Sequence, residues 1–195
     1  MIVVISSSTG GPDALKSLFK GLGDKSTPPM IVVQHMKAGI TASLTKRLGE
    51  ISKATVLEIT DGMVLKKGHV YVCPGGYNVT LEKNGTTYVF RLICASSSHH
   101  ASPNADVLLE SLEKTDMKEI LCVTLSGMGK DSLKGIIKLK NTPDKKVVVY
   151  TQSKDSCVIY GMPKAIDMAG LSDCSYDIGD MTRAIKKHIG DNGGM

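Results

Sequence analysis

IVVISSSTGGPD, residues 2–13, is the stretch of this chain that decides its fold: an apolar run leads into small and hydroxyl-bearing residues, and a proline and an aspartate follow. The apolar run predicts a buried strand, and Pro12 stands where the first turn of a helix tolerates proline. Backbone N–H groups at the start of a helix point outward and carry partial positive charge, so an anion placed there is stabilised. A strand therefore delivers hydroxyl groups to a helix start, and one of these serines is a candidate for chemistry.

Strand-like and helix-like segments alternate along most of the remaining sequence. Apolar residues recur every three or four positions from Ala14 to Leu22 and from Ile40 to Ile51, which is the spacing of amphipathic helices. Further helices are predicted over residues 103–112, after Lys130, and over residues 162–168 and 178–189. Strands are predicted over residues 30–36, 70–72, 120–125 and 147–151, with a weak one near Cys174.

In the middle of the chain, apolar and polar residues alternate as in β-strands. Residues 77–83 and 86–93 flank Asn84-Gly85, and Asn-Gly between two alternating runs is a strong signal for a β-hairpin. Because strands alternate with helices elsewhere, we predict an α/β fold: a doubly wound, mainly parallel sheet with an antiparallel β-hairpin insertion. Length and composition fit one domain, which we place at residues 1–190, with residues 191–195 as a disordered tail.

Composition argues against several classes of function. The net charge is only +5, the basic residues are scattered, and there is no Trp to stack on bases, so nucleic-acid binding is not expected. No apolar run reaches the roughly 18 residues that a membrane span needs, so membrane insertion is not expected either. The five cysteines are odd in number and lack a CxxC pair, which indicates reduced core thiols in a cytoplasmic protein.

Three polar side chains follow the predicted parallel strands at the point where each strand ends. Ser8 follows the first strand, His35 the second, and Asp131 the strand at residues 120–125. Sites in open α/β sheets form at the carboxyl ends of the strands. A serine, a histidine and an aspartate there are the components of a nucleophile, a general base and the carboxylate that orients the base.

Each of these residues also has an ordinary structural explanation when it is taken alone. The Ser-Thr-Gly-Gly turn can bind phosphate or cap a helix, His35 can be a hydrogen-bonded histidine at a strand end, and Asp131 can cap the helix that follows it. Their shared position at one sheet edge favours catalysis. The sequence lacks G-x-S-x-G, and its order of Ser, His, Asp differs from the Ser, Asp, His of α/β hydrolases.

Motifs along nearly the whole chain occur in the order seen in one known family. They are SSTGG at 7–11, QHM at 34–36, DG at 61–62, HVY at 69–71 with PGG at 74–76, PNADVL at 103–108, SGMGKD at 126–131 and VIYGMP at 158–163. In these motifs the sequence resembles the catalytic domain of the chemotaxis protein-glutamate methylesterases (CheB). The resemblance implies a seven-stranded α/β domain.

The resemblance also implies roles for individual residues. Ser8 corresponds to the nucleophile, His35 to the base and Asp131 to the orienting carboxylate, while Thr9 and Met128 correspond to the oxyanion and pocket positions through their backbone amides. The implied reaction is hydrolysis of glutamate γ-methyl esters on methyl-accepting chemotaxis receptors, with deamidation of receptor glutamines by the same acyl-enzyme chemistry. No cofactor or metal is expected.

The sequence departs from the family pattern in three respects. Full-length members usually carry an N-terminal phosphoacceptor receiver domain, which we expect this chain to lack. Ser102 stands where the family generally has arginine, and Ser132 where glycine is usual, which puts substrate affinity or specificity in question.

The adjacent His99 and His100 are expected to be solvated loop residues rather than metal ligands.

Two other classes of function remain open from the sequence. One is a phosphate- or nucleotide-binding α/β module that uses the Ser-Thr-Gly-Gly turn, although the turn lacks the lysine of a P-loop. The other is a catalytically idle domain that docks on the receptor, which the serines at 102 and 132 suggest.

Overall fold

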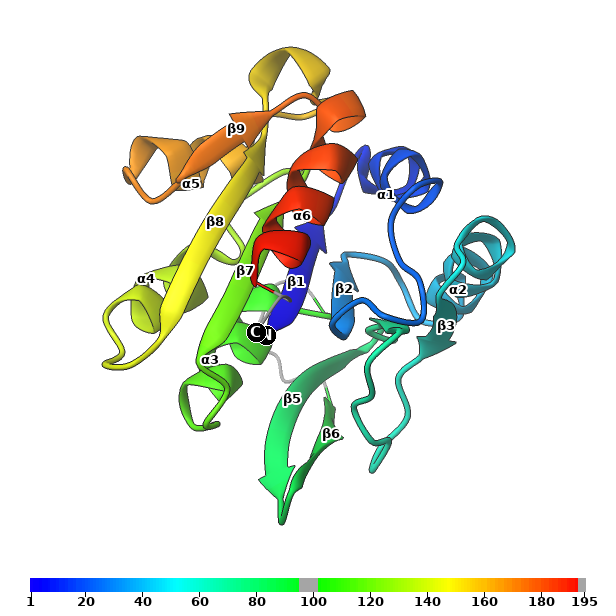
Figure 1. The fold of residues 1–195 in the computed structure, drawn as a ribbon. Coiled ribbons are helices and arrows are strands. Elements are labelled where there is room, and N and C mark those ends of the chain that lie inside the picture. Colours follow the sequence, from blue (N-terminus) through cyan, green and yellow to red (C-terminus); the bar gives the residue numbers. More distant parts are fainter. Residues whose placement is uncertain (95–101, 193–195) are drawn as a thin grey trace.

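The computed structural model of the chain, which describes residues 1–94 and 102–192, contains a central sheet with helices on both faces (Figure 1). Its elements in chain order are β1 (Ile2–Ser7), α1 (Gly11–Phe19), β2 (Met30–Gln34), α2 (Ile40–Ile51), β3 (Thr55–Glu58), β4 (His69–Val72), β5 (Tyr77–Asn84), β6 (Thr87–Cys94), α3 (Ala105–Glu113), β7 (Glu119–Thr124), α4 (Leu133–Lys140), β8 (Lys146–Gln152), a 3₁₀ turn (Lys154–Ser156), α5 (Met162–Met168), β9 (Cys174–Tyr176) and α6 (Ile178–Asn192).

The main sheet has seven strands in the order β3-β4-β2-β1-β7-β8-β9, and all its paired strands are parallel. The predicted doubly wound parallel sheet is therefore confirmed. The sequence analysis missed β3, a four-residue edge strand whose residues are all exposed or half-buried. A short strand without a buried apolar face carries little of the pattern from which strands are recognised.

The predicted hairpin is also confirmed, as β5 paired with β6 in an antiparallel register that ends at Asn84 and Thr87. Gly85 adopts a left-handed backbone with φ 60° in the turn, which glycine tolerates at little cost. The hairpin is attached to α3, because the Leu81 amide donates to Ser111 Oγ at 3.0 Å.

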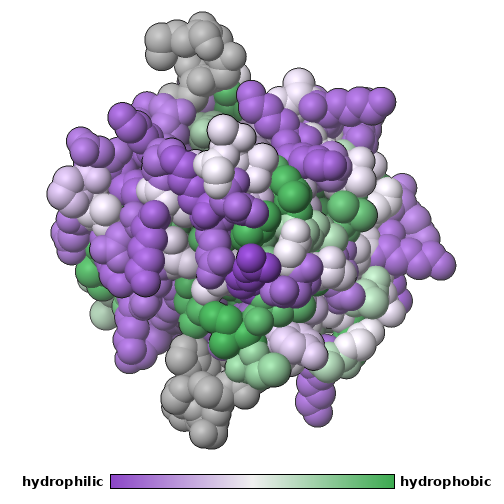
Figure 2. Space-filling model, turned by 90° about the horizontal axis from the view of Figure 1, so that it is seen from below, coloured by the Kyte–Doolittle hydropathy of each residue, from purple (hydrophilic) through white to green (hydrophobic). Residues whose placement is uncertain are grey.

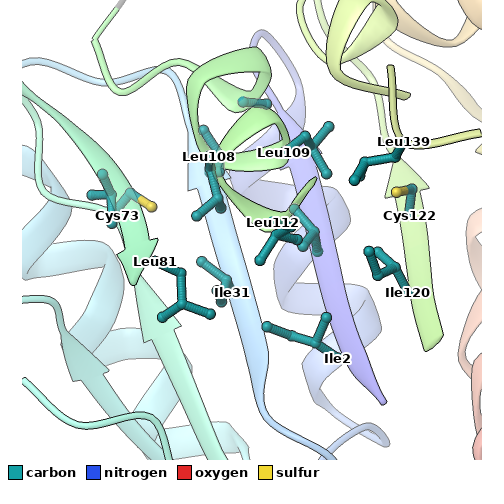
Figure 3. Close-up of a cluster of buried hydrophobic side chains, with 14 of the residues drawn as sticks. Ile2, Ile31, Cys73, Leu81, Leu108, Leu109, Leu112, Ile120, Cys122 and Leu139 are labelled. Atoms are coloured by element: carbon teal, nitrogen blue, oxygen red, sulfur yellow. The ribbon is translucent and has the colours of Figure 1, made fainter. Parts of the chain in front are cut away.

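Two hydrophobic cores lie on opposite faces of the sheet. On β1, Ile2 and Val4 belong to the core covered by α3, α4 and α5, while Val3 and Ile5 belong to the core covered by α1, α2 and α6. In the first core, Leu108, Leu109 and Leu112 of α3 pack over apolar side chains of β1, β2 and β7 (Figure 3). Strands buried on both faces need the continuous apolar runs that the sequence shows.

The outer surface is mainly hydrophilic in the view from below, with smaller hydrophobic areas between (Figure 2). Among the helices that the structure describes, none combines the length and the apolar character required to cross a membrane.

Two expectations from the sequence need correction. Helix α6 extends to Asn192, beyond the predicted end at residue 189, so it includes the first residues of the segment expected to be a tail. Of the five free cysteines, only Cys73 and Cys122 are buried, whereas Cys94 and Cys174 are exposed and Cys157 is half-buried. The prediction of core thiols is therefore right for two of the five. Burial raises the pKa of the Cys122 thiol to about 12.

Lys145 holds the C-terminal end of α3 in place. Its ammonium group donates to the carbonyls of Leu112 and Met117, each at 2.9 Å, and of Thr115 at 2.5 Å. We expect Lys145→Met to lower the free energy of unfolding by about 1–3 kcal/mol, because partly buried carbonyls lose a charged donor. Urea denaturation measures this. Arg183→Met, which removes an exposed ion pair with Asp180, serves as the control and should cost less than about 1 kcal/mol. Equal losses in the two variants would contradict this role for Lys145.

Candidate active site

The parallel register of β1 and β2 brings Ser8 and His35 to the same level of the sheet. Ser7 pairs with Gln34, so the next residue of each strand leaves the sheet beside the other. The Ser8 amide donates to the Ser126 carbonyl at 3.0 Å, and the His35 amide donates to the Ser7 carbonyl at 3.1 Å. Neighbouring strands lie about 4.8 Å apart, so two residues far apart in the sequence become near neighbours.

The buried Gln34 side chain ties the two strand ends together. Its Nε2 donates to the Ser8 carbonyl at 2.9 Å and to the His35 carbonyl at 3.1 Å, while its Oε1 accepts from the Ser7 hydroxyl at 2.7 Å. One amide group thereby fixes the backbone at both Ser8 and His35. A buried amide with all these bonds satisfied makes a local network rigid.

The side chains of His35 and Asp131 are in direct contact. Nε2 of His35 lies 2.6 Å from Oδ2 of Asp131, and the two side chains are 16% and 8% exposed. This contact uses Nε2, so Nδ1 is the ring nitrogen that it leaves available. Within the described residues, the Ser8 hydroxyl makes no hydrogen bond to the ring, which fits the looser geometry common in unliganded sites.

Asp131 is held by backbone amides as well as by His35. Oδ2 accepts from the Ala105 amide at 2.7 Å, and Oδ1 accepts from the amides of Asp106 at 3.0 Å and Ser132 at 2.9 Å. Burial pushes the pKa of Asp131 upward, but the hydrogen bonds from His35, Ala105 and Asp106 outweigh it, so the pKa lies below its ordinary value. The first amides of α3 thus keep this carboxylate ionised.

Thr9 and Met128 lie in two loops that pack together next to Ser8. A Cβ added at Gly127 would come within 2.9 Å of Ser8 Cβ, so the residue before Met128 touches the serine directly. The Ser126 hydroxyl donates to the Thr9 carbonyl at 2.8 Å, which joins the loops again. Within the described residues the backbone N–H groups of Thr9 and Met128 have no hydrogen-bond acceptor. Two such donors beside a hydroxyl can receive a developing oxyanion.

Comparison with known proteins identifies the family. Residues 3–185 match the family model described as CheB methylesterase. The chain belongs to the CheB methylesterase family. The resemblance found in the sequence motifs is thereby confirmed.

Individual relatives agree with this assignment. A protein-glutamate methylesterase/protein-glutamine glutaminase of Colwellia psychrerythraea is 35% identical over 189 residues, which cover 96% of this chain and 49% of the relative. One of the same description from Bacillus subtilis is 39% identical over 170 residues, covering 87% of this chain and 47% of the relative. The chain therefore spans about half the length of the curated relatives it matches.

A solved structure matches almost completely. The crystal structure of the Thermotoga maritima CheB methylesterase catalytic domain superposes with a TM-score of 0.90 at 34% identity, covering 96% of this chain and 98% of that one. The seven-stranded sheet and its hairpin are thus the architecture of a CheB catalytic domain.

The two serines that depart from the CheB pattern occupy different surroundings. Ser132 has φ 77°, a left-handed backbone in which glycine is favoured. Its buried hydroxyl lies 3.2 Å from Ser6 Oγ and 3.3 Å from Thr124 Oγ1, so the side chain points into the protein. The Ser102 hydroxyl is buried without a hydrogen-bond partner among the described residues.

Clusters of metal-ligating side chains are absent from the described residues. In the ranges 1–94 and 102–192, no three side chains of His, Cys, Asp or Glu gather closely enough to hold an ion. His99 and His100 lie outside the described residues, so their expected place in a solvated loop stays a prediction.

The structure places Ser8, His35 and Asp131 at one edge of the sheet, as the sequence analysis expected, and Thr9 and Met128 lie in the loops beside Ser8. The side chain of Met128 is 73% exposed, so it is the backbone amide of this residue, as the resemblance implied, that lies toward the site. Sequence reasoning missed the connecting role of Gln34 and the amides of α3 that bind Asp131. A glutamine at a buried strand end, directly before His35, was the available signal for the former, because a buried amide requires partners.

Replacing the Gln34 amide by a carboxyl group tests the network at the strand ends. Gln34→Glu places an acceptor against two carbonyl oxygens, so at pH 8 we expect a loss of about 2 kcal/mol or more in unfolding free energy. Burial raises the pKa of the new carboxyl in the folded state, so the loss should shrink as the pH falls and a protonated Glu donates to one carbonyl. Urea denaturation at pH 5 and pH 8, with the unaltered protein as control, decides this. The same loss at both pH values would contradict it.

Proposed function

We propose that this chain hydrolyses glutamate γ-methyl esters on methyl-accepting chemotaxis receptors, and deamidates receptor glutamines, through a Ser8–His35–Asp131 acyl-enzyme mechanism. The contact of 2.6 Å between His35 and Asp131, at the strand end adjacent to Ser8, is the observation that carries the proposal. The names of the relatives support it, since those from Colwellia psychrerythraea and Bacillus subtilis are both described as protein-glutamate methylesterase/protein-glutamine glutaminase.

The first half of the reaction forms the acyl-enzyme. Ser8 Oγ attacks the ester carbonyl carbon as its proton passes to Nδ1 of His35, and Asp131 stabilises the imidazolium through Nε2. The negative charge that develops on the carbonyl oxygen is received by the N–H groups of Thr9 and Met128. When the tetrahedral intermediate collapses, the bond to the methoxy oxygen breaks, and His35 returns the proton to give methanol.

The second half releases the product. A water molecule gives a proton to His35 as its oxygen attacks the acyl carbon, and the bond to Ser8 then breaks. The proton returns from His35 to Ser8 Oγ, and the new carboxylic acid releases the second proton of the water to solvent, which leaves a glutamate carboxylate on the substrate. With a glutamine substrate the first leaving group is ammonia, which takes its proton from His35 in the same way.

The proposed partners follow from this chemistry. The substrate is the cytoplasmic domain of a methyl-accepting chemotaxis receptor, which requires the enzyme to act in the cytoplasm. A phosphorylatable receiver domain is the expected partner in a full-length protein, since the curated relatives are about twice as long as this chain. The residues proposed for the chemistry are all side chains or amides of the protein itself, so we propose no cofactor or metal.

The phosphate-binding alternative loses one of its donors in the turn after β1. Within that turn the Gly11 amide donates to the Ser8 carbonyl at 2.8 Å, so this N–H is already used inside the protein. A phosphate cradle needs several outward-facing amides. The idle-domain alternative rested on Ser102 and Ser132, and the hydroxyls of both are buried, so neither side chain offers its hydroxyl to a receptor.

Removing the proposed nucleophile should abolish turnover. We expect Ser8→Ala to lower methanol release from methylated receptor by at least about 10³-fold while the circular dichroism spectrum and melting temperature stay unchanged. Ser17→Ala, which alters an exposed serine of α1, is the matched control and should retain full activity. Methanol release by Ser8→Ala at the control's rate would reject Ser8 as the nucleophile.

Neutralising the proposed orienting carboxylate should have a similar effect. Asp131→Asn keeps the shape of the side chain but cannot stabilise an imidazolium, and its NH₂ group cannot accept from the amides of α3. We expect kcat to fall by about 10⁴-fold, as for the equivalent change in a serine protease triad. Steady-state methanol release measures this, and a variant within tenfold of the unaltered enzyme would show that Asp131 has no such role.

A further inference from the structure

Helices α3 and α4 begin next to each other beside Asp131, and each helix start is bound by a carboxylate from the other segment. Asp131 precedes α4, yet it accepts from the Ala105 and Asp106 amides of α3. Asp106 lies in the first turn of α3, yet its Oδ1 accepts from the Gly135 amide of α4 at 2.8 Å. Asp131 therefore caps the start of α3, and Asp106 caps the start of α4.

The contact between the two helices is close at this point. A Cβ added to Gly135 would lie 2.5 Å from Leu109 Cβ and 3.3 Å from Asp106 Cα, so α3 and α4 touch through a residue without a side chain. The Gly135 amide is one of the N–H groups of α4 that no helical carbonyl can satisfy. Asp106 therefore supplies the missing acceptor and fixes the distance between the helix starts.

Keeping the Asp106 carboxylate ionised costs free energy in these surroundings. Burial raises its pKa to about 6, and the Gly135 amide lowers it, while the charges of Asp131 and Glu110 raise it and that of Lys134 lowers it. At pH 8 the side chain is ionised, so two carboxylates share one helix junction. A charge kept in such a place needs a structural reason, and the two caps provide one.

We propose that Asp106 is a positioning residue for the reaction. Its carboxylate holds the start of α3 against α4, so that the amides of Ala105 and Asp106 keep Oδ2 of Asp131 directed at Nε2 of His35. This inference rests on the proposed function for its kinetic consequence, but its structural part concerns the His35–Asp131 contact alone. Asp106 itself touches neither His35 nor Ser8 among the hydrogen bonds of the described residues.

The test compares two variants of Asp106 at pH 8. Asp106→Ala removes the acceptor, so Asp131 should lose its alignment and kcat for methanol release should fall by about 10²-fold, the effect of a displacement of about 1 Å. KM should stay the same, because the hydrogen bonds of Asp106 run to Asp131 and Gly135 and not to the proposed nucleophile. Asp106→Asn keeps an oxygen that can accept from the Gly135 amide and should restore most of kcat.

A spectroscopic readout separates this inference from the proposed function. The proton between His35 and Asp131 is expected as a downfield ¹H NMR signal in the free enzyme, assigned by its absence from His35→Gln. Asp106→Ala should lose or shift this signal and Asp106→Asn should keep it, whatever substrate the enzyme acts on. Should Asp106→Ala fail to fold, Asp106→Glu, whose longer side chain displaces α4, carries the same expectation as Asp106→Ala.

Asp173→Ala is the matched control. The Asp173 carboxylate accepts from the Val149 amide at 2.7 Å and binds the Lys140 ammonium, so the variant loses comparable bonds without touching Asp131. It should lower the melting temperature but keep both the NMR signal and kcat. If Asp106→Ala behaves like this control, the positioning role is overturned. If the NMR signals respond as expected but the unaltered protein releases no methanol, the positioning role stands and the proposed function fails.

Discussion

The parallel pairing of β1 with both β2 and β7 is the constraint on which the rest of the site depends. Because Ser7 pairs with Gln34 and Ser6 pairs with Thr124, the loops after all three strands leave the sheet at the same edge. A shift of one residue between β1 and β2 would turn every side chain of one strand to the opposite face. The two cores prevent this shift, since alternate residues of β1 belong to different hydrophobic clusters.

The position of Asp131 shows how helices contribute to an arrangement that strands initiate. An isolated carboxylate with 8% of its side chain exposed would be expensive to keep ionised. Here backbone N–H groups at the start of α3, which no helical carbonyl can satisfy, meet that anion. The unpaired N–H groups of the helix thus gain an acceptor, and the buried carboxylate gains donors. His35 donates to the same carboxylate.

The sequence predicted the parts of this structure that depend on local patterns. Continuous apolar runs and helical spacing were enough for the sheet, and Asn84-Gly85 was enough for the hairpin. The convergence of Ser8, His35 and Asp131 on one edge followed from the rule for parallel strands. The pattern could not reveal β3, which lacks a buried face, or the bonds of Gln34 and Asp106. Those bonds join residues that are 26 to 29 positions apart or adjacent, and only packing decides which amides they meet.

The hairpin of β5 and β6 extends away from the carboxyl edge of the sheet, with its turn at Asn84-Gly85 at the far end of the molecule (Figure 1). A Cβ added at Gly85 would meet no atom within 4 Å, although the left-handed backbone there disfavours other residues. Asn84 is the better attachment point, since it is exposed beside this open turn. In a protein whose exposed Cys94 and Cys174 are replaced by serine, a fluorophore linked through Asn84→Cys would report on tumbling or complex formation while leaving the chemistry at the opposite edge undisturbed.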